Sequence, residues 1–589
     1  MRLDPATPFV LLDDARDDGV PARLYRRPSG IVRADGPDGV APLFEKLAGA
    51  GRHGLHAAGF CSYGLGTVLE PRAGIPESGP LAWFGLFESY RTVAPGDIAA
   101  LLPDPAGAWV GEAEPEITQS EYEARVARIA EWIAAGDIYQ ANFTFRATVR
   151  AAGDPLALYA AIRKRARAGF GAIVATGEDL ILSFSPELFF ALADGRLTAR
   201  PMKGTAARGP TPALDAASRD ALHRDPKQRA ENLMILDLMR NDLGRIARPG
   251  SVQVPERFVV ETYPTVHQMV SAVTADLGPG LGAVDALRAL FPCGSITGAP
   301  KIRAMQIIGA TETSPRGVYT GAIGRIDANG DAMFNVAIRT LARTGDGRYV
   351  LGLGSGLVAD SVPAGEWREC LAKGAFLTTG QPRFDLIETM PFDPEEGILR
   401  LKRHLARLKE SAAAFGFRFD RHDARNELQA ATFRLRERVR IRLLLAAHGA
   451  TAIEVTPMPP PLPRPVRVAP MPLPVDPADF RLRHKTTNRA FYDEARRRSG
   501  ADEVVFVTPD GAVTEGSFSS VFVERDGTLV TPPLSAGLLP GILRGELIDT
   551  GRAVEGRVTP EDLTQDFYVG NALRGLNIAR LVAPAAIPG

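Results

Sequence analysis

The sequence predicts a multidomain protein of mixed α+β and α/β class, and three observations lead to this prediction. The chain has 589 residues, too many for one hydrophobic core, so roughly three or four domains are expected. Strand-like apolar runs, such as 172–176, 180–185 and 347–356, alternate with segments that carry helix signals. The pattern restarts around 376–384, which places the main boundary near residue 380.

Helix starts are predicted from local capping signals. Residues 120–123 (Ser-Glu-Tyr-Glu) have the pattern of a capping box and precede apolar residues at helical spacing that end at Gly136. A second helix is expected at 225–226, where Asp precedes a proline at the first helical position. A third is expected from Pro363 to Gly374.

Composition shifts divide the two regions further. Residues 1–115 are rich in Gly and Pro and carry only short apolar runs, whereas 116–375 contain the clearest motifs. A proline-rich stretch at 457–465 predicts a stiff linker between two structured parts, 384–456 and 466–589. We therefore expect a first domain over 1–380 and a second, two-part domain over 384–589.

Charge, cysteine content and hydropathy exclude several classes of protein. Lys plus Arg equals Asp plus Glu at 69 each, so no polyelectrolyte surface for nucleic acid is expected. The three cysteines have no CxxC spacing, which argues against a disulfide framework or a structural zinc site. No signal peptide and no apolar run of about 18 residues is found, so we expect a soluble, cytoplasmic protein without membrane association.

Three glutamates suggest a cation site in the first region. Glu366 and Glu369 are three apart on an expected helix and share one face, and Glu231 lies among apolar residues of another helix. Converging carboxylates suit a hard cation such as Mg²⁺. Spacing alone favours the simpler interpretation, local ion pairing of Glu369 with Lys373.

Two glycine-rich turns and one arginine could bind anions. The turns GSITGAP (294–300) and GLGSGLVADS (352–361) offer backbone donors, and Arg339 offers a two-pronged guanidinium for a carboxylate. Each signal is weak alone, because glycine-rich turns usually have no ligand.

The order of several motifs makes the family resemblance of the first region specific. The segments SFSPELFF, RPMKGTAARG, DPKQRAENLMILDLMRNDLGR, FPCGSITGAPKIRAMQII, YTGAIG, AIRT and GLVADSVPAGEWREC occur in this order. Over about 115–375 the chain thus resembles the chorismate-utilising enzymes, a family that includes anthranilate synthase component I and aminodeoxychorismate synthase component I. The resemblance implies an α/β sandwich with large antiparallel sheets.

The resemblance also implies roles for individual residues. It implies Mg²⁺ ligands at Glu231, Glu366 and Glu369. It implies substrate contacts from Thr297, Arg339, Gly354, Ser355 and Gly356. His267 matches the family's active-site histidine, and Glu187 resembles the general acid that protonates the departing C4 hydroxyl of chorismate.

Lys203 assigns the region to one branch of the family. The anthranilate branch typically has alanine where PMKGT has lysine, whereas in the aminodeoxychorismate branch the lysine is thought to attack C2 and direct ammonia to C4. Outside this motif, an exposed, solvated lysine would be the ordinary interpretation.

The first region also departs from the family pattern. Gln228 replaces an acidic residue of several relatives, and Cys293 replaces a common glycine. No glutaminase segment is recognisable, so ammonia is expected from solution or from a separate glutamine amidotransferase subunit.

The second region resembles another family. Its segments RHLARL, HKTTNR, VTEGSFSSVF and TPPLSAGLLPGILR are similar to those of fold-type IV pyridoxal-phosphate enzymes, which have a two-subdomain α+β fold and commonly dimerise. The resemblance implies a Schiff-base lysine at Lys485, a ring-nitrogen partner at Glu515 and phosphate contacts at Arg407, Ile542 and Leu543. Asn571 and Ala572 would lie near phosphate and substrate, and Thr389 is a further candidate contact. The family's usual opening strand and loop before the segment FDLIETM are either missing here or supplied by the first half of the chain.

Together the resemblances imply a fusion that makes 4-aminobenzoate. The first half would aminate chorismate at C4, and the second would eliminate pyruvate from the product. Two alternatives remain: an anthranilate synthase half joined to an unrelated aminotransferase, or a fusion in which one half is a non-catalytic module.

Overall fold

The computed structural model describes residues 3–74, 79–263 and 266–583, and the chain forms two compact units. The first unit contains Met1–Leu102, Glu112–Val149 and Tyr159–Thr379. The second contains Gly380–Gly589 together with Pro103–Gly111 and Arg150–Leu158. These two short segments belong to the second unit although the sequence analysis places them in the first region.

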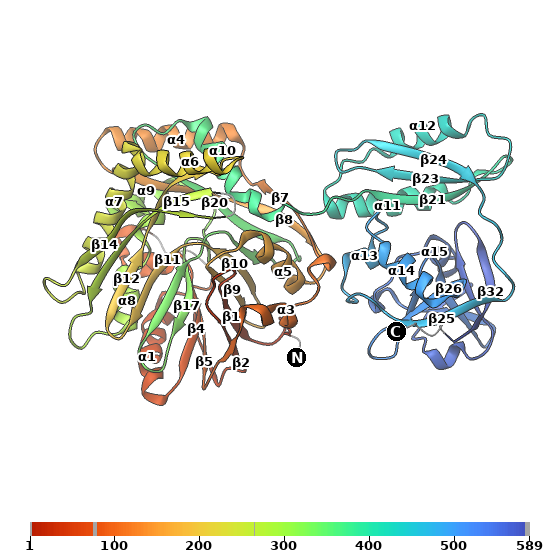
Figure 1. The fold of residues 1–589 in the computed structure, drawn as a ribbon, viewed down its shortest axis with the longest axis horizontal. Helices are drawn as coiled ribbons and strands as arrows, with labels where there is room; N and C mark the ends of the chain where they lie inside the picture. The colour runs from red at the N-terminus through yellow and green to blue at the C-terminus, as the bar shows by residue number, and fades with distance from the viewer. Residues whose placement is uncertain (1–2, 75–78, 264–265, 584–589) are drawn as a thin grey trace. The chain divides into compact units, whose positions relative to one another are not determined.

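Within the described residues, the first unit is built on two ten-stranded sheets whose paired strands are antiparallel (Figure 1). The first has the order β16 (Gly298–Ala299), β8 (Gln140–Ala152), β20 (Tyr349–Leu357), β19 (Thr340–Arg343), β10 (Leu180–Ser185), β9 (Phe170–Ala175), β1 (Phe9–Asp13), β2 (Ala22–Arg26) and β6 (Arg91–Val93), with β7 (Trp109–Pro115) beside β8. The second has the order β13 (Met202–Ala207), β15 (Val266–Asp276), β12 (Arg196–Arg200), β11 (Leu188–Ala193), β18 (Ala332–Val336), β17 (Ala322–Ile326), β4 (His56–Cys61), β5 (Ala82–Phe87) and β3 (Gly30–Ala34), with β14 (Gln253–Thr262) beside β15.

The two sheets pack face to face. One buried apolar cluster joins Val10 and Val174 of the first sheet to Phe60 and Trp83 of the second. Inward-facing apolar residues of both sheets therefore form a common core. The predicted sandwich with large antiparallel sheets is confirmed.

Helices cover the outer faces of this sandwich. α1 (Val40–Ala50), α7 (Pro226–Gly244) and α8 (Ala283–Leu290) pack on the second sheet through a large apolar cluster. α4 (Gln119–Ala134) and α10 (Pro363–Gly374) cover the first sheet, where Trp367 stacks on Phe145. The other helices of this unit are α2 (Leu65–Leu69), α3 (Ile98–Leu101), α6 (Pro212–Arg224), α9 (Lys301–Thr311) and the part of α5 (Pro155–Ala166) from Tyr159 onward. No helix in the described ranges is long and apolar enough to cross a membrane.

The predicted helix starts are confirmed for α7 and α10, but the predicted cap of α4 is wrong by two residues. Thr118, not Ser120, is its N-cap: the Thr118 hydroxyl accepts from the Glu121 amide and the Glu121 carboxylate accepts from the Thr118 amide. Thr118 has the extended backbone that a cap requires, whereas Ser120 already lies in the first turn.

The second unit contains two further sheets in the described residues (Figure 1). The smaller has the order β22 (Gly397–Ile398), β21 (Leu386–Asp393), β23 (Val439–Leu445) and β24 (Thr451–Pro457), with α11 (Leu401–Phe415) and α12 (Arg421–Thr432) on its apolar face. The larger has the order β27 (Val513–Gly516), β26 (Glu503–Val507), β25 (Val466–Pro472), β32 (Gly575–Leu581), β31 (Phe567–Asn571), β28 (Ser520–Arg525), β29 (Thr528–Thr531) and β30 (Ala553–Glu555). Its helices are α13 (Phe480–Arg483), α14 (Ala490–Ser499) and α15 (Ile542–Asp549). The predicted two-part fold is confirmed, and residues 458–465 between the sheets form no strand or helix.

Candidate active sites

The first candidate site surrounds Lys203 on β13. Its ammonium nitrogen lies 3.6 Å from a carboxylate oxygen of Glu231 on α7, and the two side chains are only 22% and 17% exposed. The neighbouring residue on α7, Asn232, donates to the Lys203 carbonyl oxygen (3.0 Å) and accepts from the Ser271 hydroxyl (2.6 Å). These bonds fix α7 against β13 and β15, so the Lys203 ammonium is held in a partly desolvated position.

Gly356 on β20 provides the space that Lys203 needs. A Cβ atom at Gly356 would lie 2.8 Å from the Lys203 ammonium nitrogen and 3.2 Å from Nε2 of Gln140. Such contacts are shorter than ordinary van der Waals packing, so a larger residue here would force the ends of the Lys203 and Gln140 side chains to move. The side chain of Ser355 has a different environment, because its hydroxyl bonds Tyr122 (3.0 Å) and is fully buried. Ser355 can therefore contribute only its backbone.

Gln140 is a further candidate site residue, which was not predicted from the sequence. Its side chain is fully buried, and neither its amide nitrogen nor its amide oxygen has a hydrogen-bond partner among the described residues. A buried amide without partners is costly, so the group is suited to a polar ligand beside Lys203. The only sequence signal is a polar residue at the start of the strand-like run QANFTF.

Glu187 is brought to the same place as Lys203. Its side chain is 5% exposed, and burial raises its pKa to about 7, although a hydrogen bond from the Ser295 hydroxyl (2.8 Å) and the Lys203 charge act in the opposite direction. The carboxyl can therefore carry a proton near neutral pH, as a general acid must.

Arg339 follows β18 and has the strained left-handed backbone (φ +50°) that non-glycine residues rarely adopt. Burial lowers its pKa, and none of the described residues makes a hydrogen bond or ion pair with its guanidinium. It therefore has the properties of a carboxylate-binding group. Thr297 differs, because its hydroxyl is buried and donates to the Cys293 carbonyl oxygen (2.8 Å).

The three glutamates predicted to bind a metal do not form a ready ligand set. Glu369 pairs with Lys373 (2.8 Å) on α10, which is the alternative that spacing favoured, and Glu231 pairs with Lys203. Across the described ranges, no three His, Cys, Asp or Glu side chains are grouped so that they could hold a metal ion.

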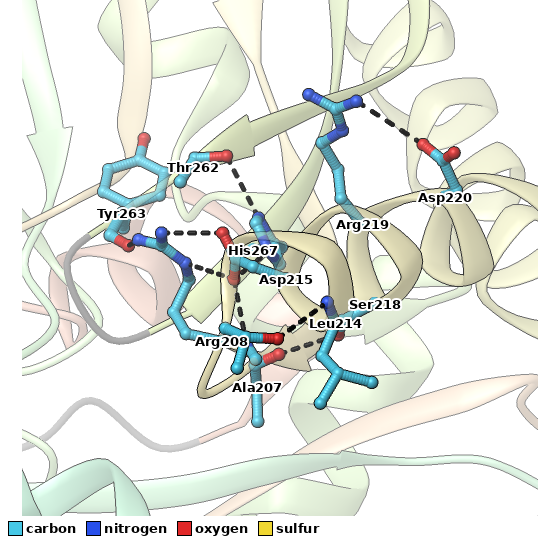
Figure 2. Close-up of polar contacts among 12 residues, drawn as sticks. Ala207, Arg208, Leu214, Asp215, Ser218, Arg219, Asp220, Thr262, Tyr263 and His267 are labelled. Atoms are coloured by element: carbon cyan, nitrogen blue, oxygen red, sulfur yellow. Dashed lines mark hydrogen bonds and ion pairs between the residues drawn. The ribbon is translucent and has the colours of Figure 1, made fainter.

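His267 lies in a closed polar network that Figure 2 shows. Its Nδ1 lies 3.0 Å from the Thr262 hydroxyl and its Nε2 lies 2.9 Å from Asp215 on α6. Arg208 holds the same carboxylate with two bonds of 2.7 Å, and this keeps the pKa of Asp215 well below its usual range. Both ring nitrogens are thus used and the ring is 1% exposed, so His267 joins β15 to α6.

The second candidate site is a cavity of about 410 Å³ in the second unit, and Lys485 lies on its wall. The Lys485 carbonyl oxygen accepts from the Ile387 amide (2.9 Å), and its ammonium donates to the Thr389 hydroxyl (3.0 Å). Burial and the nearby Arg407 lower the pKa of Lys485 to about 7, although Glu388 opposes this shift. The amine is consequently available as a nucleophile near neutral pH.

Glu515 of β27 lines the same cavity. It is 6% exposed and accepts from the Tyr492 hydroxyl (2.5 Å) and the Leu539 amide (3.2 Å). Burial raises its pKa to about 7, because these bonds only partly compensate for lost hydration. A cation in the cavity would allow this carboxylate to ionise.

Arg407 is held by Glu388, a residue that the sequence analysis missed. Its Nε and Nη2 donate to Glu388 (2.8 and 2.7 Å), and its Nη1 donates to the Pro540 carbonyl oxygen (2.9 Å). Burial alone would raise the pKa of Glu388, but Arg407 and the hydrogen bond with His404 (2.6 Å) hold it well below the usual range. A guanidinium has five N–H donors, so two remain for a ligand.

Ile542 and Leu543 begin α15, directly after Gly541. The amides in the first turn of a helix have no acceptor within the helix, and no side chain caps this end. Gly541, Ile542 and Leu543 all line the cavity. The helix start thus offers backbone donors to an anion, beside the carbonyl that Arg407 contacts. Asn571 and Ala572 also line this cavity.

Comparison with known families agrees with this division of the chain. Residues 23–379 match the family described as chorismate binding enzyme, and residues 385–581 match the family described as amino-transferase class IV. The boundary between the matches, between 379 and 385, coincides with the change from the first unit to the second.

Similar proteins are found for the first half. Over 257 residues the chain is 45% identical to aminodeoxychorismate synthase component 1 of Klebsiella aerogenes, covering 44% of this chain and 57% of that protein. It is 43% identical over 265 residues to anthranilate synthase component 1 of Pseudomonas putida, covering 44% and 54%. The chain thus spans little more than half the length of these curated relatives. The crystal structure of anthranilate synthase component I from Streptococcus pneumoniae TIGR4 matches with a TM-score of 0.53 and 28% identity, over 61% of this chain and 92% of that one.

Proposed function

Because the chain belongs to the chorismate-binding enzymes and also carries a class IV aminotransferase domain, we propose that it converts chorismate to 4-aminobenzoate in two steps. The first unit would replace the C4 hydroxyl of chorismate with an amino group. The second would eliminate pyruvate from that product. The observation that carries the proposal is the position of Lys203, which is partly desolvated, pairs with Glu231, lies against Gly356 and acts on Glu187 through its charge.

In the first reaction, Arg339 would bind a carboxylate of chorismate. Lys203, after its ammonium has given a proton to Glu231 at 3.6 Å, would attack C2 as a neutral amine. As the Lys203 nitrogen bonds to C2, the C4–O bond breaks, and the proton of Glu187 leaves with the hydroxyl as water. Ammonia then bonds to C4 and the bond from C2 to Lys203 breaks. The surplus proton of the new amine returns to Glu187, and Lys203 takes its own proton back from Glu231. The net change is chorismate plus ammonia to 4-amino-4-deoxychorismate plus water. His267 would act by positioning β15 rather than by touching substrate.

The raised pKa of Glu187 predicts how amination depends on pH. The protonated acid is present below about pH 7 and is lost as the pH rises through that value. At a fixed concentration of free ammonia, kcat/KM for chorismate should therefore fall above about pH 7. Glu187→Gln should lower the rate by about 10²-fold and remove this limb of the profile. A profile unchanged by the substitution would assign the limb to another group.

We propose Mg²⁺ as a cofactor of this reaction, bound by Glu231, Glu366 and Glu369, because carboxylate oxygens are the donors it prefers. As they stand, these residues do not fit the ion as a ready site, since Glu231 and Glu369 are each paired with a lysine. The proposed chemistry above therefore rests on side chains alone.

The source of ammonia is proposed to be a separate partner. The relatives named component 1 support a glutamine amidotransferase as a second component. Free ammonium should replace that partner in vitro, as expected when the amination site is complete without it.

The cavity of the second unit fits pyridoxal phosphate in its donor set. Lys485 supplies an amine with a pKa of about 7, and Glu515 is a buried carboxyl whose pKa stays at about 7 although the charge of Arg489 lowers it. The phosphate would be bound by the amides of Ile542 and Leu543 and by the two N–H groups of Arg407 that remain available.

When bound, pyridoxal phosphate would supply a conjugated ring that takes up the electrons released from the substrate's C4–H bond. Glu515 would face the ring nitrogen and keep it protonated, which in turn allows Glu515 to ionise. Lys485 would hold the cofactor and then accept the C4 proton at its Nζ. The C3–O bond of the substrate breaks as the ring becomes aromatic, and the departing enolpyruvate takes up a proton to become pyruvate.

One reaction tests the proposal as a whole. The full chain is incubated with chorismate, ammonium and Mg²⁺, with and without pyridoxal phosphate, and the products are separated. We expect 4-aminobenzoate and pyruvate with the cofactor, and 4-amino-4-deoxychorismate without it. Anthranilate as the main product would instead support the anthranilate synthase alternative.

A further inference from the structure

A second group of cations lines the cavity of the second unit after the proposed cofactor contacts are assigned. Arg440 on β23, Arg496 on α14 and Arg574 after β31 are all half-buried and line the same cavity as Lys485. None of them belongs to the phosphate, ring-nitrogen or aldehyde contacts proposed above. These three arginines therefore remain available to bind the substrate.

The three guanidinium groups lie near one another and lack sufficient counter-charge. Arg496 and Arg574 both lie over the ring of Phe518, at 5.4 and 6.0 Å from its centroid. Nε of Arg496 is buried without a hydrogen-bond partner among the described residues. The only ion pair of Arg496 with a described residue joins its Nη2 to Asp493 at 3.2 Å. Burial lowers the pKa of Arg574, and the charges of Arg440 and Arg496 lower it further.

Acidic groups neutralise the cluster only in part, because Asp493 pairs with Arg496 alone. Glu503 favours the charged form of Arg574, but its carboxylate accepts hydrogen bonds from Ser517 and Ser519, and burial raises its pKa. Like charges in a partly desolvated cavity repel one another, so an anion between them would be strongly stabilised.

Strand register places this cluster relative to Lys485. The Lys485 ammonium donates to Thr389, and Thr389 on β21 lies directly opposite Arg442 on β23. Arg440 is two residues from Arg442 and therefore lies on the same face of the sheet. Arg442 thus lies beside Lys485, and Arg440 lies on the same face of the sheet, one position farther from the lysine.

We propose that Arg440, Arg496 and Arg574 form a carboxylate subsite that selects amines whose carboxylate lies across a ring from the amino group. The inference rests on the proposed function of the second unit. In 4-amino-4-deoxychorismate the ring carboxylate is opposite the C4 amine, so an amine at Lys485 directs this carboxylate away from the lysine. In a simple α-amino acid both groups share one carbon, and the carboxylate stays near Lys485. The subsite therefore favours the ring substrate over ordinary aminotransferase substrates.

The test measures binding of 4-aminobenzoate to the full chain loaded with pyridoxal phosphate. Calorimetry is performed on the unsubstituted protein and on Arg574→Met, Arg496→Met and Arg574→Lys, with aniline as the probe that lacks a carboxylate. We expect each methionine variant to bind 4-aminobenzoate about tenfold more weakly or worse, because a charge-assisted contact is lost. Arg574→Lys should retain part of the affinity, and binding of aniline should not change. Binding in the first unit is common to all variants and does not alter the comparison.

Arg497→Met is the matched control. Arg497 is next to Arg496 on α14, but its side chain is 72% exposed and pairs with Glu494. If this variant weakens binding as much as Arg496→Met, or if both cavity variants bind like the unsubstituted protein, the subsite is refuted. If Arg574→Met does not fold, Arg574→Lys and Arg496→Met decide the question. Failure of the proposed function looks different: 4-aminobenzoate would still bind through these arginines, but no pyruvate would be released from 4-amino-4-deoxychorismate.

Discussion

Replacing Lys485 by alanine is expected to stop 4-aminobenzoate formation while 4-amino-4-deoxychorismate accumulates. Lys485 is the lysine of the second cavity whose pKa is lowered to about 7, and its amine is proposed both to hold the cofactor and to move the C4 proton. Losing both roles should lower pyruvate release by about 10³-fold or more. The measurement is the rate of pyruvate release from added 4-amino-4-deoxychorismate, together with the visible absorbance of the bound cofactor.

The control for this substitution is Lys409→Ala on α11. Lys409 is exposed, so its loss removes a positive charge from the same unit without altering the cavity. The amination rate of both variants should equal that of the unsubstituted protein, which shows that the first unit is folded. Full 4-aminobenzoate output from Lys485→Ala would refute the assignment of the second unit as a lyase.

Replacing Lys203 by alanine is expected to abolish amination at C4 and to leave the second reaction intact. The substitution removes the proposed nucleophile and leaves Glu231, which is 17% exposed, without its partner at 3.6 Å. Loss of a nucleophile in this position should lower the rate of chorismate consumption by about 10³-fold. Consumption of chorismate is measured with free ammonium, so that no glutaminase step can limit it.

Lys46→Ala on α1 is the matched control, because Lys46 is exposed and belongs to the same unit. It should leave chorismate consumption unchanged. Lys203→Ala should still release pyruvate when 4-amino-4-deoxychorismate is added, since Lys485 is untouched. If Lys203→Ala aminates chorismate at C4 at the original rate, the lysine has no part in the chemistry.

Most of the fold could be predicted from local patterns. The starts of α7 and α10 followed from a proline at the first helical position, and the runs at 172–176, 180–185 and 347–356 correspond to β9, β10 and β20. These signals are local, because caps and periodicity involve only near neighbours in sequence. The assignment of 103–111 and 150–158 to the second unit could not be predicted in this way, because it depends on long-range packing.

The candidate sites were predicted less completely. Glu388 was missed because a single acid in an apolar strand carries no pattern, and only the packing of α11 on β21 brings it to Arg407. Gln140 was missed because a single polar residue at the start of a strand likewise forms no recognisable pattern. His267 was predicted as an active-site histidine, and its contacts with Thr262 and Asp215 could be found only from the structure.

Motif order in the sequence was sufficient to assign the two halves to their families and to single out Lys203 and Lys485, because long motifs preserve residue types at fixed spacing. Only the tertiary structure decided which charged side chains lie close together. It paired Glu369 with Lys373 rather than with a ready metal site, and it placed Arg440, Arg496 and Arg574 around one cavity. The physical reason is that charge and desolvation act over a few ångströms in space, between residues that can be more than a hundred positions apart in the chain.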